Sequence, residues 1–154
     1  MYQRILVPVD GSVASSKGLK EAIAIARASG GRILLLHVVD DMPLLITGAE
    51  SAGLSADVFA ALRDAGERIL AEAKREVERA GVAVESPLFE NIDLPLWKRI
   101  AALVGEWRVE LIVMGTHGRR GVRRVVLGSD AEQVVRTATV PVLLVRGGDE
   151  SHAG

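Results

Sequence analysis

The chain has 154 residues, of which 20 are acidic and 19 basic, so its formal net charge is −1. This length fits one domain with an independent core, and the balanced charge gives no overall field that would recruit nucleic acid or an anionic membrane. The sequence holds no cysteine and no apolar run near the ~18 residues of a membrane span, which excludes disulfides, thiol catalysis and zinc–thiolate sites and leads us to expect a cytoplasmic protein.

The amino-terminal part predicts a strand, a helix and a second strand. Ile5 to Val9 is a short, continuously apolar run, which is typical of a strand buried on both faces. Asp10-Gly11-Ser12 then predicts a turn and a helix cap, and Gly30-Gly31 predicts the end of that helix. Residues 33–39 form a second apolar run. The predicted inner face of the helix consists of Leu19, Ala22, Ile23 and Ala26.

The middle of the chain predicts a loop, a long helix and an edge strand. Residues 40–55 hold two glycines and a proline, and loops of this length often cover sites. A helix ending at Gly81 follows, and Val82 to Phe89 is a weaker strand whose Pro87 favours the sheet edge. The predicted inner face of this helix consists of Val58, Leu62, Ala65, Ile69, Ala73 and Val77.

The carboxyl-terminal part predicts two more helices and two more strands. Asp93 can cap a helix, and Leu111 to Met114 is a fourth strand. Ser129-Asp130-Ala131-Glu132 has the pattern of a capping box and opens a further helix. The last strand is Val142 to Val145, and we expect a domain over residues 1–146 and a flexible tail over 147–154. The predicted inward residues of the two helices are Leu96, Ile100, Leu103 and Val104, and then Ala131, Val134, Val135 and Ala138.

Strands that alternate with helices predict an α/β domain. We expect a single doubly wound, five-stranded parallel sheet of Rossmann-like order 3-2-1-4-5, with helices on both faces. Ligands of such sheets bind beyond the carboxyl ends of the strands, where the strand order reverses. The first and fourth strands flank that point, so Asp10 and Gly115 are expected to face one crevice.

The most informative stretch is Gly115-Thr116-His117-Gly118, followed by Gly128-Ser129. Glycines at a strand's carboxyl end let the backbone approach a ligand, and a glycine before a helix leaves amide groups to meet an anion. The alternative is that the glycines only form turns and Ser129 only caps a helix. The connecting loop carries four arginines, of which we expect at most one or two to touch phosphate: Arg119, Arg120, Arg123 and Arg124.

With its spacing, Gly115-x2-Gly118-x9-Gly128-Ser129 resembles the nucleotide-binding signature of the ATP-binding branch of the universal stress protein family. The resemblance covers nearly the whole chain, including the segments 5–10, 36–40 and 140–145. It implies an ATP-binding protein of the stress response that acts through nucleotide-dependent binding, with at most slow hydrolysis.

The resemblance also implies roles for individual residues. Asp10 would hold the ribose hydroxyls, with Pro8 and Val9 along the wall, and the backbone of Val38 would meet the adenine edge. A carboxylate can accept from two hydroxyls, and backbone amides suit phosphate oxygens. The remaining implied binding residues are Met114 and, around the phosphates, Gly115, His117, Gly118, Gly128 and Ser129. The local alternatives are a turn cap for Asp10, core packing for the Val38 side chain and a solvated loop position for His117.

Asp130 departs from the family pattern, in which a small or apolar residue usually follows the serine. As a local feature it is a favourable acid in the first turn of a helix. In the binding interpretation it repels phosphate, or it helps to hold a Mg²⁺ ion that bridges the phosphates. The implied cofactors are therefore ATP and, through the phosphates, Mg²⁺, and no protein metal site is expected.

The sequence predicts binding rather than catalysis, because it shows no Walker lysine and no serine–histidine–acid arrangement. Two alternatives stay open: a phosphohydrolase or nucleotide transferase that uses the same cradle, and a dimeric interaction module that binds no nucleotide. The apolar last strand, 142–145, predicts an exposed edge that pairs with a second copy, as in the family's usual antiparallel dimer. Its alternative is an edge protected by the chain's own tail.

Overall fold

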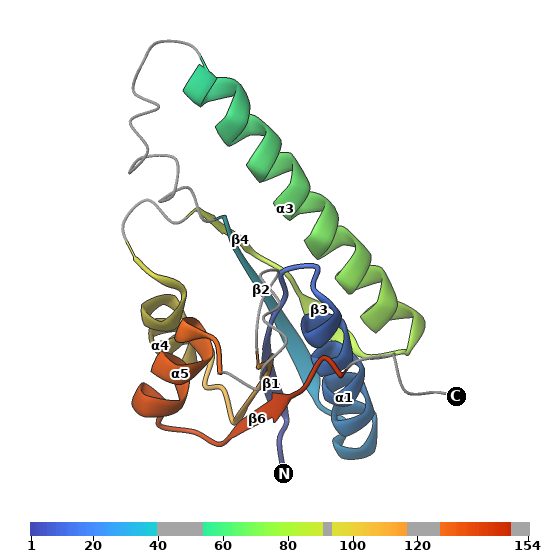
Figure 1. The fold of residues 1–154 in the computed structure, drawn as a ribbon. Helices are drawn as coiled ribbons and strands as arrows, with labels where there is room; N and C mark the ends of the chain where they lie inside the picture. The colour runs from blue at the N-terminus through green and yellow to red at the C-terminus, as the bar shows by residue number, and fades with distance from the viewer. Residues whose placement is uncertain (40–53, 91–93, 117–126, 149–154) are drawn as a thin grey trace, which may run out of the picture.

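The structure is a computed structural model that describes residues 1–39, 54–90, 94–116 and 127–148 (Figure 1). Strands and helices largely alternate along the described residues, as the apolar runs and glycine stops predict. The elements are β1 (Arg4–Pro8), α1 (Val13–Ser29), β2 (Arg32–Val39), α3 (Leu54–Arg79), β3 (Ala83–Glu85), β4 (Leu88–Glu90), α4 (Leu96–Glu106), β5 (Leu111–Gly115), α5 (Ser129–Thr137) and β6 (Val142–Val145).

The strands form one parallel sheet in the order β3-β2-β1-β5-β6, which confirms the predicted order 3-2-1-4-5. The predicted third strand, residues 82–89, is two short strands instead of one. Both β3 and β4 pair in parallel with β2, and Pro87 lies between them. Proline has no N–H to donate to a strand ladder, so pairing is interrupted there and the prediction of an edge position is confirmed.

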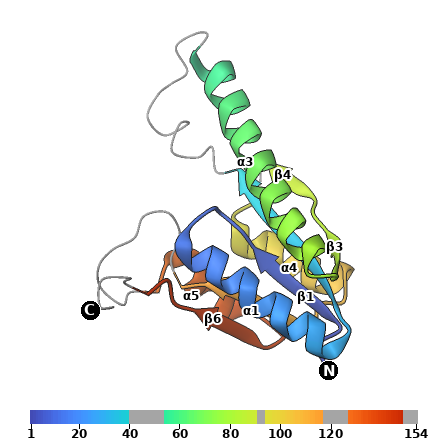
Figure 2. The same cartoon turned by 90° about the vertical axis from the view of Figure 1, so that its right-hand side faces the viewer.

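The two faces of the sheet are covered by different helices (Figures 1 and 2). Ile5 and Val7 of β1 belong to the core formed with α1 and α3, whereas Leu6 belongs to the core formed with α4 and α5. All three side chains are fully buried, because successive residues of a strand point to opposite faces. The continuous apolar run is thus explained by burial on both faces.

Helix α1 begins and ends where the sequence predicts. The Ser12 side chain caps its first turn by accepting from the N–H of Ser15, and Gly30 ends it in a left-handed conformation with φ 68°. Helix α3 includes Leu54 from the predicted 40–55 loop, while residues 40–53 lie outside the described residues. In Figure 2 the amino-terminal half of α3 extends beyond the sheet. Its buried apolar residues are Leu70, Ala73 and Val77, whereas Val58, Leu62, Ala65 and Ile69 are only partly buried.

Three local predictions for the later helices are wrong. The N-cap of α5 is Gly128, without a side-chain hydrogen bond, so the predicted capping box does not form and Ser129 is already helical. Val135 is 46% exposed, because this nine-residue helix buries only the face that carries Ala131 and Val134. The N-cap of α4 is Pro95, two residues after Asp93, which itself lies outside the described residues. Among the helices that the structure describes, none is long and apolar enough to cross a membrane.

Candidate functional site

The strand order reverses between β1 and β5, which are neighbours with Ile5 opposite Leu111. The chain leaves β1 towards α1 on one face, and α5, the next helix described after β5, lies on the other face. Connections that diverge in this way leave a crevice at the carboxyl edge of the sheet. Asp10 follows β1 and Gly115 ends β5, so the structure brings both to this edge, as the sequence predicts.

Asp10 makes two hydrogen bonds within the turn after β1, and its neighbour Val9 is bound to β2. The Oδ1 atom of Asp10 accepts from the N–H of Ser12 at 2.8 Å, and the Asp10 N–H donates to Oγ of Ser15 at 3.1 Å. The preceding residue, Val9, donates its N–H to the carbonyl of Leu36 at 2.7 Å. The local role of Asp10 in the turn is therefore real. It does not use up the carboxylate, which offers about four acceptor positions in all.

Gly115 is required by helix packing. A Cβ atom at this position would lie 2.8 Å from both the carbonyl carbon and the Cβ of Ala14 on α1. Real Cβ atoms essentially never approach other atoms so closely, so the glycine lets α1 lie directly against the end of β5. The sequence pattern assigns this glycine to a ligand, and the structure supplies a packing reason for it that the pattern does not reveal.

Thr116 joins the two parts of the glycine signature, although the sequence pattern gives it no role. Its N–H donates to the carbonyl of Val145 at 3.0 Å, and its carbonyl accepts from the N–H of Gly128 at 2.7 Å. Gly128 and Ser129 are thereby held beside the carboxyl end of β5. Residues 117–126, which include the predicted site residues His117 and Gly118 and the four loop arginines, lie outside the described residues.

The first turn of α5 differs from that of α1. Its N-cap, Gly128, has no side chain, whereas Ser12 caps α1 with its hydroxyl. Backbone amides at a helix start that carries no side-chain cap suit an anion. Ser129 and Asp130 are the first two residues of α5 and both are exposed. Asp130 and Glu132 place two acidic side chains in the same turn, which opposes an anion there.

The remaining predicted site residues lie at the ends of β1, β2 and β5. Pro8, Val9 and Met114 are buried, and Val38 is partly buried against the core of α4 and α5. The side chains of Met114 and Val38 therefore belong to the core, which leaves their backbone at the edge. His37, next to Val38, has a partner outside its own strand: its Nδ1 lies 2.7 Å from the carbonyl of Val9 at the end of β1.

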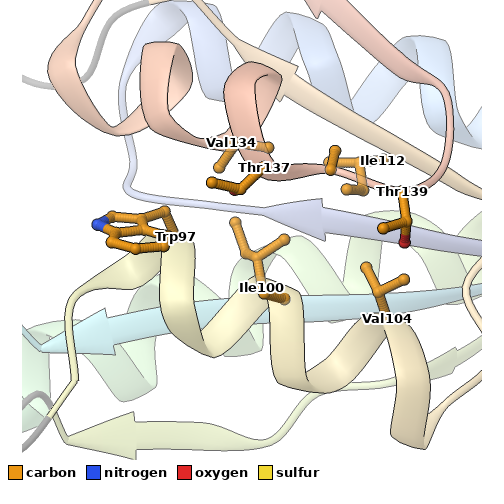
Figure 3. Close-up of a pocket in the computed structure, with 9 residues that line it drawn as sticks. Trp97, Ile100, Val104, Ile112, Val134, Thr137 and Thr139 are labelled. Carbon is orange, nitrogen blue, oxygen red and sulfur yellow. The ribbon is translucent and has the colours of Figure 1, made fainter.

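Two described cavities lie away from this edge. Figure 3 shows an apolar pocket of about 60 Å³ between α4 and α5. A second cavity of about 500 Å³ lies at the opposite, amino-terminal edge of the sheet and includes Arg4, Arg32 and Trp107. No predicted site residue lines either one. In the described ranges there is no group of three or more His, Asp or Glu side chains that could hold a metal ion. The pocket of Figure 3 is lined by Trp97, Ile100, Ala101, Val104, Ile112, Val134, Thr137, Ala138 and Thr139.

Comparisons with known proteins agree with this architecture. The model of the universal stress protein family matches residues 1–146. The universal stress protein MJ0531 of Methanocaldococcus jannaschii is 32% identical over 95% of this chain and 83% of its own length. The solved structure of MJ0577 from the same organism superposes with a TM-score of 0.80 at 27% identity, over 97% of this chain and 99% of that one. A universal stress protein of Arabidopsis thaliana, solved with AMP bound, shares the fold with a TM-score of 0.67 at 20% identity, over 94% of this chain and 91% of that one.

Proposed function

The chain belongs to the universal stress protein family, and we propose that it acts in the stress response by binding an adenine nucleotide, ATP, between the ends of β1 and β5. The observation that carries the proposal is the meeting of two distant segments at the switch point of the sheet. Asp10 follows β1, and the Thr116–Gly128 hydrogen bond brings the uncapped start of α5 to the end of β5. A carboxylate and a helix start at one edge match a ribose and a phosphate.

In this proposal each part of the nucleotide meets the chemistry that suits it. The Asp10 carboxylate accepts from the ribose hydroxyls, and the backbone of Val38 meets the adenine edge. The phosphates lie against Gly128 and Ser129, with Gly115, His117 and Gly118 completing their surroundings. The AMP held by the Arabidopsis protein supports the capacity of the fold for an adenylate, and the individual roles are those that the resemblance to the family implies for the matching positions.

We propose that Mg²⁺ binds together with ATP, through its phosphates. Asp130 is exposed in the first turn of α5, where its charge acts on whatever the helix start binds. We expect Asp130→Asn to raise the affinity for ATP in the absence of Mg²⁺ by a few fold at low salt, because a negative charge is removed. If Asp130 instead holds a bridging Mg²⁺, the same variant will bind Mg-ATP more weakly than the wild type.

We also propose that the protein is a cytoplasmic homodimer formed through β6. This strand has β5 as its neighbour in the described sheet, and Leu143 is 37% exposed on it. An apolar edge strand offers unpaired backbone groups to a second copy, which supports antiparallel pairing of the two β6 strands. In such a two-fold symmetric dimer, partner proteins would recognise nucleotide binding at the nearby crevice of each copy.

Calorimetric titration with Mg-ATP tests the proposed function. Asp10→Asn is the most specific variant for this test. Its amide oxygen can still accept from the Ser12 N–H, whereas the negative charge that would strengthen the hydrogen bonds from the ribose hydroxyls is removed. We expect a loss of about tenfold or more in affinity, since hydrogen bonds to a charged group contribute about 1.5–3 kcal/mol. Asp64→Asn, at an exposed position on α3, is the matched control and should bind like the wild type.

The same samples separate binding from catalysis. We expect ATP loss near background over the time of the titration, with no dependence on Asp10. Steady turnover well above background that disappears in Asp10→Asn would favour the phosphohydrolase or transferase alternative. A wild-type protein that gives no binding heat with Mg-ATP would overturn the proposal. It would favour the interaction module that binds no nucleotide.

A further inference from the structure

The peptide group between Val9 and Asp10 is held at both of its polar atoms by side chains of two different elements. Its carbonyl contacts Nδ1 of His37, on β2, at 2.7 Å. Its N–H donates to Oγ of Ser15, on α1, at 3.1 Å. A carbonyl oxygen only accepts, so Nδ1 of His37 carries the proton in this contact. Two side-chain partners on one peptide fix the orientation of its plane.

A ring of hydrogen bonds continues from this peptide to the Asp10 carboxylate. The N–H of Ser15 donates to Oγ of Ser12 at 3.1 Å, and the N–H of Ser12 donates to Oδ1 of Asp10 at 2.8 Å. With the bond from the Asp10 N–H to Ser15 the ring closes over three residues. Ser15 is 6% exposed and is the one buried polar side chain among the described residues. Burying a hydroxyl costs free energy unless it is hydrogen-bonded, which points to a specific use for this group.

We propose that Ser15 and His37 are positioning residues that aim the Asp10 carboxylate and so give the site its selectivity for ribose over sugars without the 2′ and 3′ hydroxyls. The proposal rests on the proposed function, in which Asp10 receives those hydroxyls. Neither residue acts on the nucleotide directly. Because hydrogen bonds weaken steeply with misalignment, a carboxylate that turns away loses its bonds to the ribose while the phosphate contacts persist.

The test compares ATP with 2′,3′-dideoxy-ATP by calorimetry. We expect the wild type to prefer ATP by at least about 100-fold, as two hydrogen bonds to a charged group imply. Ser15→Ala and His37→Leu should each reduce this preference about tenfold and change the affinity for dideoxy-ATP less than about twofold. His37→Asn should keep the preference, because its amide nitrogen takes the place of Nδ1. Ser16→Ala, on the exposed neighbour in α1, is the matched control.

Equal losses for both nucleotides would show a purely structural role and overturn the proposal, as would a preference that no variant changes. Amide hydrogen exchange without nucleotide provides a second readout. We expect the Asp10 amide to be protected in the wild type and to exchange at least tenfold faster in Ser15→Ala. If the wild type binds neither nucleotide, the proposed function is wrong and the selectivity proposal falls with it. If ATP binds but the Asp10 amide exchanges at the same rate in the wild type and in Ser15→Ala, the role of the hydrogen-bond ring is refuted and the proposed function is not.

Discussion

Gly115→Ala tests the packing of α1 against the end of β5. The added methyl group would lie 2.8 Å from the carbonyl carbon and the Cβ of Ala14 and 3.0 Å from the nitrogen of Ser15. Two of these three atoms are backbone, so no side chain can turn aside. The start of α1 must therefore move by about 0.6 Å to restore the 3.4 Å of ordinary contact.

The cost of such overpacking is about 1–3 kcal/mol. In a domain of this size 1 kcal/mol corresponds to roughly 2–4 °C in Tm, so we expect Gly115→Ala to lower Tm by about 2–12 °C. The shift also moves Ser12 and Ser15, which hold Asp10, so nucleotide affinity should fall with stability.

Gly105→Ala is the control, because a Cβ there meets nothing within 4 Å and the residue is helical in α4. It should stabilise the fold by about 0.5–1 kcal/mol. Thermal unfolding followed by circular dichroism measures both variants. A Gly115→Ala protein as stable as the wild type would refute the packing argument, and a destabilised Gly105→Ala would show that the glycine comparison itself is unsound.

Three further predictions concern other contacts. Ser12→Ala removes the cap of α1 and should lower the free energy of unfolding by about 1 kcal/mol in urea titrations, and an unchanged midpoint would refute the capping role. Lys17→Met removes the hydrogen bond from Nζ to the carbonyl of Gly147, which holds the end of the described chain against α1. Trypsin should therefore cut faster after Arg146 in this variant, and equal cleavage rates in the variant and the wild type would contradict this role. Leu143→Asp should convert the proposed dimer to a monomer in light scattering at micromolar concentration. A wild-type protein that is itself monomeric would refute the proposed dimer.

The sequence predicts those parts of the fold that depend on local rules. Continuous apolar runs mark the buried strands, since both faces of β1 and β2 are covered by helices. Glycine stops are equally local, because a left-handed residue such as Gly30 ends a helix wherever it occurs. The switch point follows from the order of elements alone, which is why Asp10 and Gly115 could be placed at one edge.

Long-range contacts explain what the sequence does not predict. The sequence pattern predicts Ser129 as the cap of α5, but the N-cap is Gly128. The N–H of Gly128 donates to the carbonyl of Thr116, twelve residues earlier, and this contact is not visible in the local sequence. The helical periodicity of α3 reveals its apolar face but not where the sheet beneath it ends, so its first half is less buried than predicted. The reason for Gly115 lies in Ala14, a neighbour that only the fold provides.

An adenine nucleotide bound at the carboxyl edge of the sheet would change the chemical shifts of the backbone amides there. Titration of ¹⁵N-labelled protein with Mg-ATP, followed by amide chemical shifts, tests it most directly. We expect the shifts to concentrate on Asp10, Thr116 and Ser129, while Arg32 and Trp107 at the opposite edge stay unchanged. Shifts confined to the opposite edge, or no shifts at millimolar Mg-ATP, would contradict it.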